Sequence, residues 1–148
     1  MELKRSNHCV YQIRYHLVLC VKYRRKLLKP KDRCDYLKYI LKEIGERYSF
    51  ELEEMGTDGD HIHVFVGAAP KYAPSRVMQI LKSISAREMF KRFPDIRKQL
   101  WGGEFWSDGG YIGTVGDGVT SEIVKKYVRE QGSHEEKESE EQIQLFQL

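Results

Sequence analysis

Residues 9–23 read CVYQIRYHLVLCVKY, and this stretch decides the fold. Every odd position in it carries an apolar or aromatic side chain. The clearly polar residues occupy even positions, namely Gln12, Arg14, His16 and Lys22. Successive side chains of a β-strand point to opposite faces of a sheet, so a period of two indicates a strand with one buried face. We therefore predict a long N-terminal strand that belongs to a sheet.

The rest of the chain alternates helical and strand patterns. After that strand we predict, in order, an amphipathic helix over 36–48, strands over 49–55 and 61–68 joined by the Gly- and Asp-rich turn 56–60, a helix capped at Pro74–Ser75 and ended by Pro94, a strand over 104–115, and a helix from Ser121 through Gln131. This order predicts an α+β, ferredoxin-like (RRM-like) fold, in which helices cover one face of an antiparallel sheet.

Length and charge suggest one basic domain with an acidic end. The 148 residues are 41% hydrophobic, which suits a single core. The net charge of +3 hides an asymmetry, because five glutamates crowd the end of the chain: Glu135, Glu136, Glu138, Glu140 and Glu141. We expect a domain over 1–132 and a flexible acidic tail over 133–148. The basic body favours polyanionic partners.

Several classes of protein are disfavoured by what the sequence lacks. No apolar run reaches the ~18 residues of a membrane span, and the N-terminus has no secretory pattern, so we expect a cytoplasmic protein without a membrane partner. The three cysteines, Cys9, Cys20 and Cys34, show no CxxC spacing, which argues against a disulfide framework or a zinc knuckle. The phosphate loop GxxxxGK[ST] is missing, so no nucleotide cofactor is expected.

Two pairs of residues have spacings that suit a catalytic site. His61 and His63 lie two apart on a predicted strand, which places both imidazoles on one face, where they could bind one metal ion. Tyr127 and Gln131 are four apart on a predicted helix and share a face. The alternatives are ordinary polar histidines on a half-exposed strand and a core tyrosine on the apolar stripe of its helix.

A basic segment follows the first predicted strand. This segment places an aromatic ring among cations and consists of Lys22, Tyr23, Arg24 and Arg25, with Lys26 directly after them. Single-strand binders use cations for phosphates and aromatic rings for bases, so this cluster is a candidate nucleic-acid-binding site. A solvated surface loop is the alternative.

These residues together resemble a known family. The triplet His61-Ile62-His63, the later Trp106, the segment Thr114-Val115-Gly116, and Tyr127 with Gln131 are similar to the single-tyrosine HUH transposases of the 200/605 group of insertion sequences, where H is histidine and U a bulky apolar residue. The resemblance extends from about Asn7 to Gln131. It implies a fold of the HUH endonuclease type.

The resemblance also implies a reaction and its participants. Members of the family cleave and transfer single-stranded DNA at hairpins near the element ends, through a 5′-phosphotyrosine intermediate. By position, Tyr127 would be the nucleophile, and His61, His63 and Gln131 would bind Mg²⁺ or Mn²⁺. Asp60 ranks below Gln131 as a ligand, because strand alternation would point it to the other face. The family also implies a homodimer with active sites shared between subunits.

Two other functions remain open on the sequence. A relaxase or a replication-initiator nuclease also pairs a HUH site with a tyrosine, although such proteins usually have a third histidine and a longer chain. A non-catalytic module that binds single-stranded nucleic acid would use the same sheet and basic segment, with the histidines and Tyr127 in structural roles.

Overall fold

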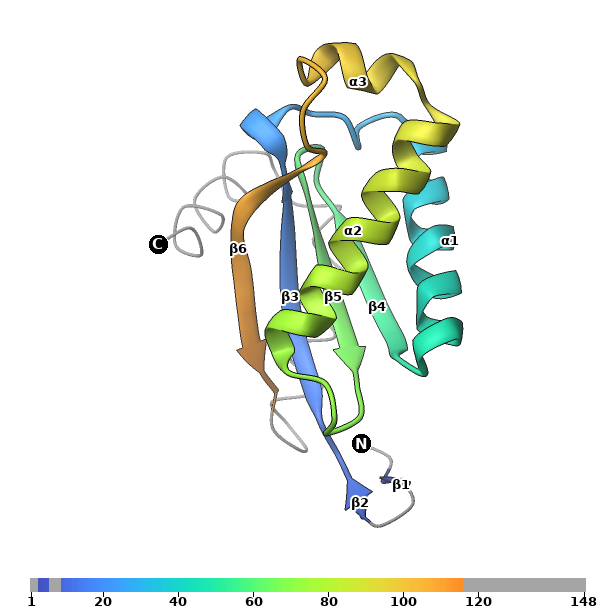
Figure 1. The fold of residues 1–148 in the computed structure, drawn as a ribbon, viewed down its shortest axis with the longest axis vertical. Coiled ribbons are helices and arrows are strands. Elements are labelled where there is room, and N and C mark those ends of the chain that lie inside the picture. Colours follow the sequence, from blue (N-terminus) through green and yellow to red (C-terminus); the bar gives the residue numbers. More distant parts are fainter. Residues whose placement is uncertain (1–2, 6–8, 116–148) are drawn as a thin grey trace.

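The computed structural model describes residues 3–5 and 9–115 and has an antiparallel sheet of four strands at its centre (Figure 1). The strands run β3 (Arg14–Val21), β4 (Glu51–Thr57), β5 (His61–Gly67) and β6 (Trp106–Thr114), and their order in the sheet is β4-β5-β3-β6. Two long helices, α1 (Lys31–Tyr48) and α2 (Pro74–Arg92), lie against one face. The predicted α+β, ferredoxin-like architecture is confirmed.

Four short elements complete the described part of the chain. β1 (Lys4–Arg5) and β2 (Val10–Tyr11) pair with each other beyond one end of the main sheet. The 3₁₀ turn η1 (Lys22–Arg24) follows β3, and the short helix α3 (Asp95–Gln99) follows α2. The prediction of one strand over 9–23 is therefore wrong at both ends, because the pairing breaks after Tyr11 and the chain turns at Lys22. The sequence pattern did not predict α3.

The hydrophobic core lies between the sheet and the two long helices. The odd-numbered side chains of β3 that the sequence marked as apolar point into it, and Leu17, Leu19 and Val21 are fully buried. Ile62 and Val64 of β5 join them, and the helices contribute Leu37, Leu41, Val77 and Leu81. Burial of each such side chain stabilises the fold by roughly 1.5–3 kcal/mol. The predicted buried face of the first strand is thus confirmed.

The opposite face of β3 is also buried, which the alternating pattern did not predict. His16, Val18 and Cys20 occupy even positions and are nearly inaccessible to solvent. Arg14 is buried as well, and its guanidinium donates to Glu51 Oε2 at 2.9 Å and to Glu53 Oε1 at 2.7 Å on β4, the edge strand beyond β5. The expectation that the even positions of β3 face water, which rested on their polar side chains, is therefore wrong.

The ends of several elements shift by a few residues from their predicted positions. Ser49, at the end of α1, adopts a left-handed conformation (φ 58°), so β4 begins only at Glu51 and runs to Thr57. Ala73 is the N-cap of α2, and Pro74 is its first helical residue, where the fixed φ of proline suits a helix. The predicted helix 121–131 and the tail 133–148 lie outside the described residues. Within the described ranges, no helix is long and apolar enough to cross a membrane.

Candidate metal and nucleic-acid site

The two predicted histidines lie on β5, on the face of the sheet away from α1 and α2. His61 and His63 are both fully buried, and their ring centroids are 5.0 Å apart. Ile62 and Val64, on alternate positions of the same strand, enter the helix-side core. The strand geometry therefore brings the two imidazoles together as their spacing implies.

Asp60 fixes the orientation of His61. Its Oδ1 lies 2.7 Å from His61 Nδ1, a distance at which the ring N–H donates to the carboxylate. In the neutral ring this tautomer leaves the lone pair on Nε2, and Nε2 is buried with no hydrogen-bond partner among the described residues. Strand alternation was a poor guide to Asp60, because this residue precedes the first residue of β5. The Asp60 side chain faces the His61 ring and hydrogen-bonds to it.

His16 plays the corresponding part for His63. The Nε2 atom of His16 lies 2.8 Å from Nδ1 of His63, and the rings are stacked with centroids 5.1 Å apart. Burial lowers the pKa of His16 to about 4. Burial holds the pKa of His63 well below its usual value, and the neighbouring His61 and His16 lower this pKa further. Both rings are therefore neutral near pH 7, and one nitrogen of the contact donates while the other accepts.

Sequence reasoning missed His16 as part of this site. The residue stood at an even position of β3 and was counted among side chains expected to face water. In the structure, Val18 is the partner of His63 across the strands, so His16 lies diagonally beside His63 on the same face. The sequence offered one indication of its role, because His16 is a histidine among apolar neighbours on a predicted strand. Only the register of β3 against β5 shows that it contacts His63.

The histidine pair fits a divalent transition-type metal ion. Neutral imidazoles are common metal ligands, and in such sites the second ring nitrogen usually donates to an outer partner that fixes the tautomer. Asp60 provides that partner for His61. No group of three or more His, Cys, Asp or Glu suited to a metal is found within 3–5 and 9–115. The other predicted members of the site, Tyr127 and Gln131, lie outside the described residues.

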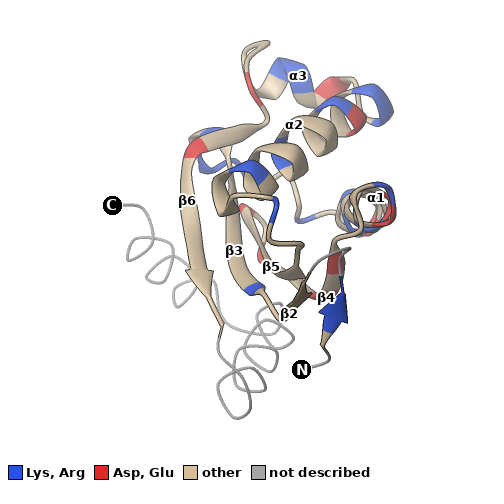
Figure 2. Cartoon of the chain, turned by 60° about the horizontal axis from the view of Figure 1, so that its bottom comes forward, with Lys and Arg blue, Asp and Glu red and all other residues tan. Residues whose placement is uncertain are grey.

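The basic cluster predicted at 22–25 forms the exposed turn η1. Tyr23 and Arg24 adopt positive φ values of 59° and 55°, and the tyrosine ring is 56% exposed. Lys22 Nζ lies 3.7 Å from a Glu104 carboxylate oxygen, and Arg24 Nε lies 3.7 Å from Asp60 Oδ2. The Lys and Arg positions of η1 and of α3, blue in the cartoon, lie toward the same end of the molecule (Figure 2). The predicted cluster thus adjoins the histidine pair through Asp60.

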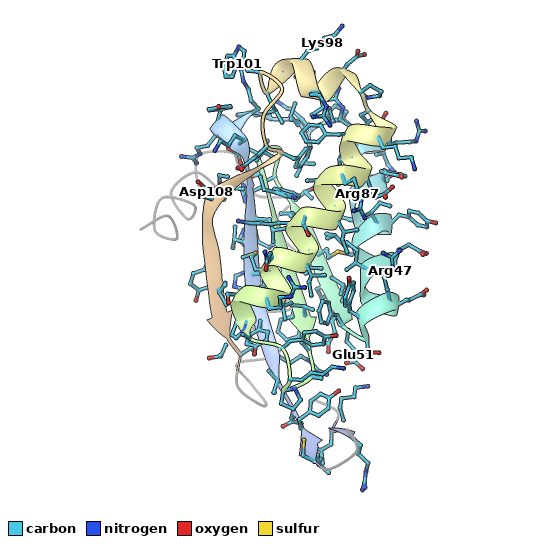
Figure 3. All side chains as sticks on the ribbon, viewed as in Figure 1. Arg47, Glu51, Arg87, Lys98, Trp101 and Asp108 are labelled. Atoms are coloured by element: carbon cyan, nitrogen blue, oxygen red, sulfur yellow. The ribbon has the colours of Figure 1, made fainter. Side chains whose placement is uncertain are left out.

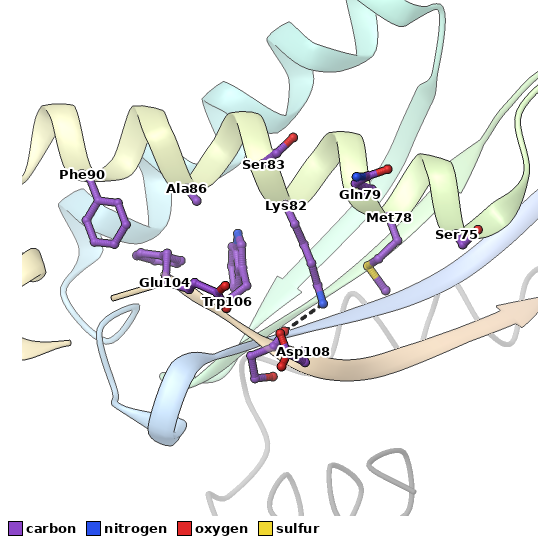
Figure 4. A pocket seen from close by; sticks show the side chains of 12 residues that line it. Ser75, Met78, Gln79, Lys82, Ser83, Ala86, Phe90, Glu104, Trp106 and Asp108 are labelled. Atoms are coloured by element: carbon purple, nitrogen blue, oxygen red, sulfur yellow. Dashed lines mark hydrogen bonds between the residues drawn. The ribbon is translucent and has the colours of Figure 1, made fainter. Parts of the chain in front are cut away.

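A separate cavity of about 560 Å³ lies between α2 and β6 (Figure 4). Lys82 crosses it and donates to the backbone carbonyl oxygens of Ser107 at 2.9 Å and Gly109 at 3.1 Å. Burial lowers the pKa of this lysine. Trp106 lines the cavity and donates from Nε1 to Ser85 Oγ at 3.0 Å. Because the cavity opens on the helix side of the sheet, it is not part of the histidine site.

Comparison with known proteins identifies the family. The family model described as "Transposase IS200 like" matches residues 9–131, which include the histidine pair, the basic turn and Tyr127 with Gln131. The chain belongs to the IS200-like transposase family. The resemblance inferred from the sequence is therefore confirmed, and with it the transposase function of the chain at the level of its family.

Individual relatives agree with this membership. The ISDra2 transposase TnpA of Deinococcus radiodurans is 36% identical over 135 residues, covering 91% of this chain and 95% of that protein. The transposase for insertion sequence element IS200 of Salmonella typhimurium is 29% identical over 124 residues, covering 84% and 80%. The alignment with each thus spans most of both chains.

Two solved structures share the architecture. A crystal structure of a Deinococcus radiodurans R1 protein matches with a TM-score of 0.70 and 32% identity, covering 86% of this chain and 97% of the other. A REP-associated tyrosine transposase bound to a REP hairpin matches with a TM-score of 0.55 and 12% identity, covering 86% and 70%. At that low identity the second match supports the fold alone. Together they confirm the HUH-type fold.

Proposed function

We propose that this IS200-like transposase cleaves and rejoins single-stranded DNA at hairpin-bearing ends, with Tyr127 as the nucleophile. His61 and His63 would hold Mg²⁺ or Mn²⁺, and Gln131 would supply a further oxygen ligand. The observation that carries the proposal is the buried His61 ring, whose Nδ1 is engaged by Asp60 while its Nε2 has no partner among the described residues. A buried acceptor in that state is suited to a cation.

The reaction divides one exchange of phosphodiester bonds into two displacements. The Tyr127 hydroxyl loses its proton and attacks phosphorus, which forms a 5′-phosphotyrosine bond and breaks the bond to the 3′ oxygen. That oxygen takes up a proton and leaves as a 3′-hydroxyl. In the second displacement another 3′-hydroxyl attacks the phosphotyrosine, and the tyrosine recovers its proton. Each displacement breaks one phosphoester bond and forms another, so no nucleotide triphosphate is needed.

A bound divalent ion would polarise the scissile phosphate and stabilise the departing oxygen. Imidazole and amide donors suit Mn²⁺ better than Mg²⁺, although Mg²⁺ is the more abundant ion in cells. We expect either ion to support cleavage. The protein's contribution is to place His61 and His63 side by side on one strand, and the lowered pKa of His63 favours the neutral, metal-binding form of that ring.

The proposal is tested with a hairpin DNA that carries one fluorophore at its 5′ end and another at its 3′ end. In Mn²⁺ or Mg²⁺ the 3′ fluorophore should migrate with the protein on a denaturing gel, whereas the 5′ fluorophore should appear in a shorter free strand. EDTA should prevent both changes. Binding of the same DNA without any covalent species, in either metal, would contradict the proposal and favour a non-catalytic binding module.

His16 should matter for metal binding, although it is not a ligand in the proposal. Replacing His16 by phenylalanine removes the hydrogen-bond partner that lies 2.8 Å from His63 Nδ1, so the tautomer of His63 is no longer fixed. Loss of such an outer partner typically weakens metal affinity by roughly 10- to 100-fold. Glutamine keeps a side-chain oxygen and should recover part of the affinity. Titration of the metal-free protein with Mn²⁺, followed by electron paramagnetic resonance, measures the effect.

The control for this experiment is Val66→Ala, a core substitution on the helix side of β5. It should lower the melting temperature without changing Mn²⁺ affinity. If His16→Phe and His16→Gln both bind Mn²⁺ as tightly as the unmodified protein, His16 has only a packing role. A loss that merely tracks the melting temperature across all three variants would lead to the same conclusion.

A further inference from the structure

An exposed aromatic cluster joins two loops that are far apart in the sequence. Tyr23 in η1 and Trp101, just after α3, meet edge to face with ring centroids 5.0 Å apart and an interplanar angle of 78°. The Arg25 guanidinium carbon lies 5.0 Å from the Trp101 centroid. Both rings remain open to solvent, with Tyr23 56% and Trp101 70% exposed. Figure 3 shows Trp101 projecting from the end of the molecule near α3.

The backbone of this cluster is in an unusual conformation. Four residues other than glycine have positive φ in the described chain, and three of them are Tyr23, Arg24 and Trp101. The fourth, Ser49, ends a helix, where a left-handed residue is common. L-residues adopt this conformation at a cost, and such strain collects at functional sites. Here it turns two large rings toward solvent, although burying them would be favourable.

The chemistry of the cluster matches an unpaired nucleotide. A nucleobase stacks on an indole or phenol ring, and neighbouring cations bind the phosphates on either side. Lys22, Arg24, Arg25 and Lys26 surround Tyr23 in the sequence and provide those cations. Arg25 lies over one face of the Trp101 ring, and the high exposure of Trp101 leaves ring surface for a base. Neither ring is buried, so the arrangement adds little to the hydrophobic core.

We propose that Tyr23 and Trp101 form a stacking clasp for an unpaired base of the DNA strand. This inference rests on the proposed function, because it assigns a place to the single strand that is cleaved. It adds Trp101, which the sequence pattern did not indicate, and it gives Tyr23 a defined partner. The clasp binds the base through its ring face, so it accepts any base, while phosphate contacts fall to the surrounding cations.

A continuous set of contacts links the clasp to the histidine pair. Arg24 follows Tyr23, and its Nε lies 3.7 Å from Asp60 Oδ2. The other oxygen of Asp60 holds His61 Nδ1 at 2.7 Å. The backbone N–H of Val21, at the end of β3, also donates to the Asp60 carbonyl oxygen at 2.8 Å. The clasp is therefore connected to the histidine pair through Arg24 and Asp60.

The test compares a thymidine oligonucleotide with an abasic strand of equal length, which keeps the phosphates and lacks the bases. In the full-length protein, Trp101→Ala and Tyr23→Ala should each weaken binding of the thymidine strand by roughly fivefold to a hundredfold. Binding of the abasic strand should change little. Trp101→Phe keeps an aromatic face and should retain most of the affinity. Tyr39→Ala is the matched control, because Tyr39 on α1 is 55% exposed and lies outside the cluster.

Intrinsic fluorescence gives a direct readout of stacking. The chain has two tryptophans, and Trp106 is only 4% exposed, so quenching by DNA should come from Trp101 and disappear in Trp101→Phe. Unchanged affinity in Trp101→Ala and Tyr23→Ala, or equal losses for the two strands, would overturn the clasp. The covalent-adduct assay tests the cleavage function separately. If the adduct forms but the variants show no base-dependent loss of affinity, the clasp alone is refuted. If the base-dependent loss of affinity is seen but no adduct forms, only the cleavage function is refuted.

Discussion

Replacing Tyr127 by phenylalanine should leave the DNA bound and uncleaved. The substitution removes one oxygen atom and keeps the aromatic ring, so the hydrophobic contribution of the side chain changes little. Without the hydroxyl no phosphotyrosine bond can form, and loss of a nucleophile lowers turnover by roughly a thousandfold or more. On the denaturing gel the 3′ fluorophore should no longer migrate with the protein, in either Mn²⁺ or Mg²⁺. Fluorescence anisotropy should report an affinity for the hairpin within about threefold of the unmodified protein.

Tyr111 provides the matched control for this experiment. It lies on β6, on the same face of the sheet as the histidines, and its ring contacts His16 edge to face with centroids 5.5 Å apart. It is therefore a competing nucleophile within the described residues. Tyr111→Phe should form the adduct as the unmodified protein does. An adduct that persists in Tyr127→Phe and disappears in Tyr111→Phe would move the nucleophile from the predicted helix to the sheet.

Periodicity predicted the sheet and its helices because burial of apolar area dominates their formation. The apolar side chains at the odd positions of β3 and along one side of α1 are the ones that this burial requires, so the spacing of apolar residues in the sequence predicts both elements. Element ends were harder to place. The end of α1 at Ser49 depends on a left-handed conformation, and the end of β3 at Val21 depends on a turn with two positive φ values. Neither conformation has a signature in hydrophobic spacing.

The candidate site was predictable only where neighbours in sequence are also neighbours in space. His61 and His63 share a face because they are two apart on one strand, and Asp60 adjoins them along the chain. His16 comes from another strand, and its contact with His63 follows from the register of β3 against β5, which the sequence does not reveal. Trp101 meets Tyr23 through two loops whose strained backbones are set by tertiary contacts. Long-range pairing is therefore what the sequence reading lacked.

Replacing either His61 or His63 by alanine should abolish cleavage while hairpin binding persists. Each substitution removes one imidazole nitrogen from the proposed metal site, and the remaining ring cannot hold a divalent ion tightly alone. We expect Mn²⁺ affinity to fall by more than about a hundredfold and the adduct to become undetectable. The basic turn at Tyr23 and Arg24 is intact in both variants, so hairpin affinity should change by no more than about threefold.

Stability has to be separated from chemistry here, because both histidines are fully buried and alanine leaves a cavity. Phe65→Ala is the matched control, since Phe65 is fully buried on β5 two residues after His63, on the same face. It should lower the melting temperature at least as much as the histidine variants and still form the adduct below that temperature. Added imidazole should restore part of the cleavage in His61→Ala and His63→Ala, because the small ring fits the cavity and returns the missing nitrogen. Full cleavage by both alanine variants without imidazole would show that the pair serves packing, and the metal would then have to be held elsewhere.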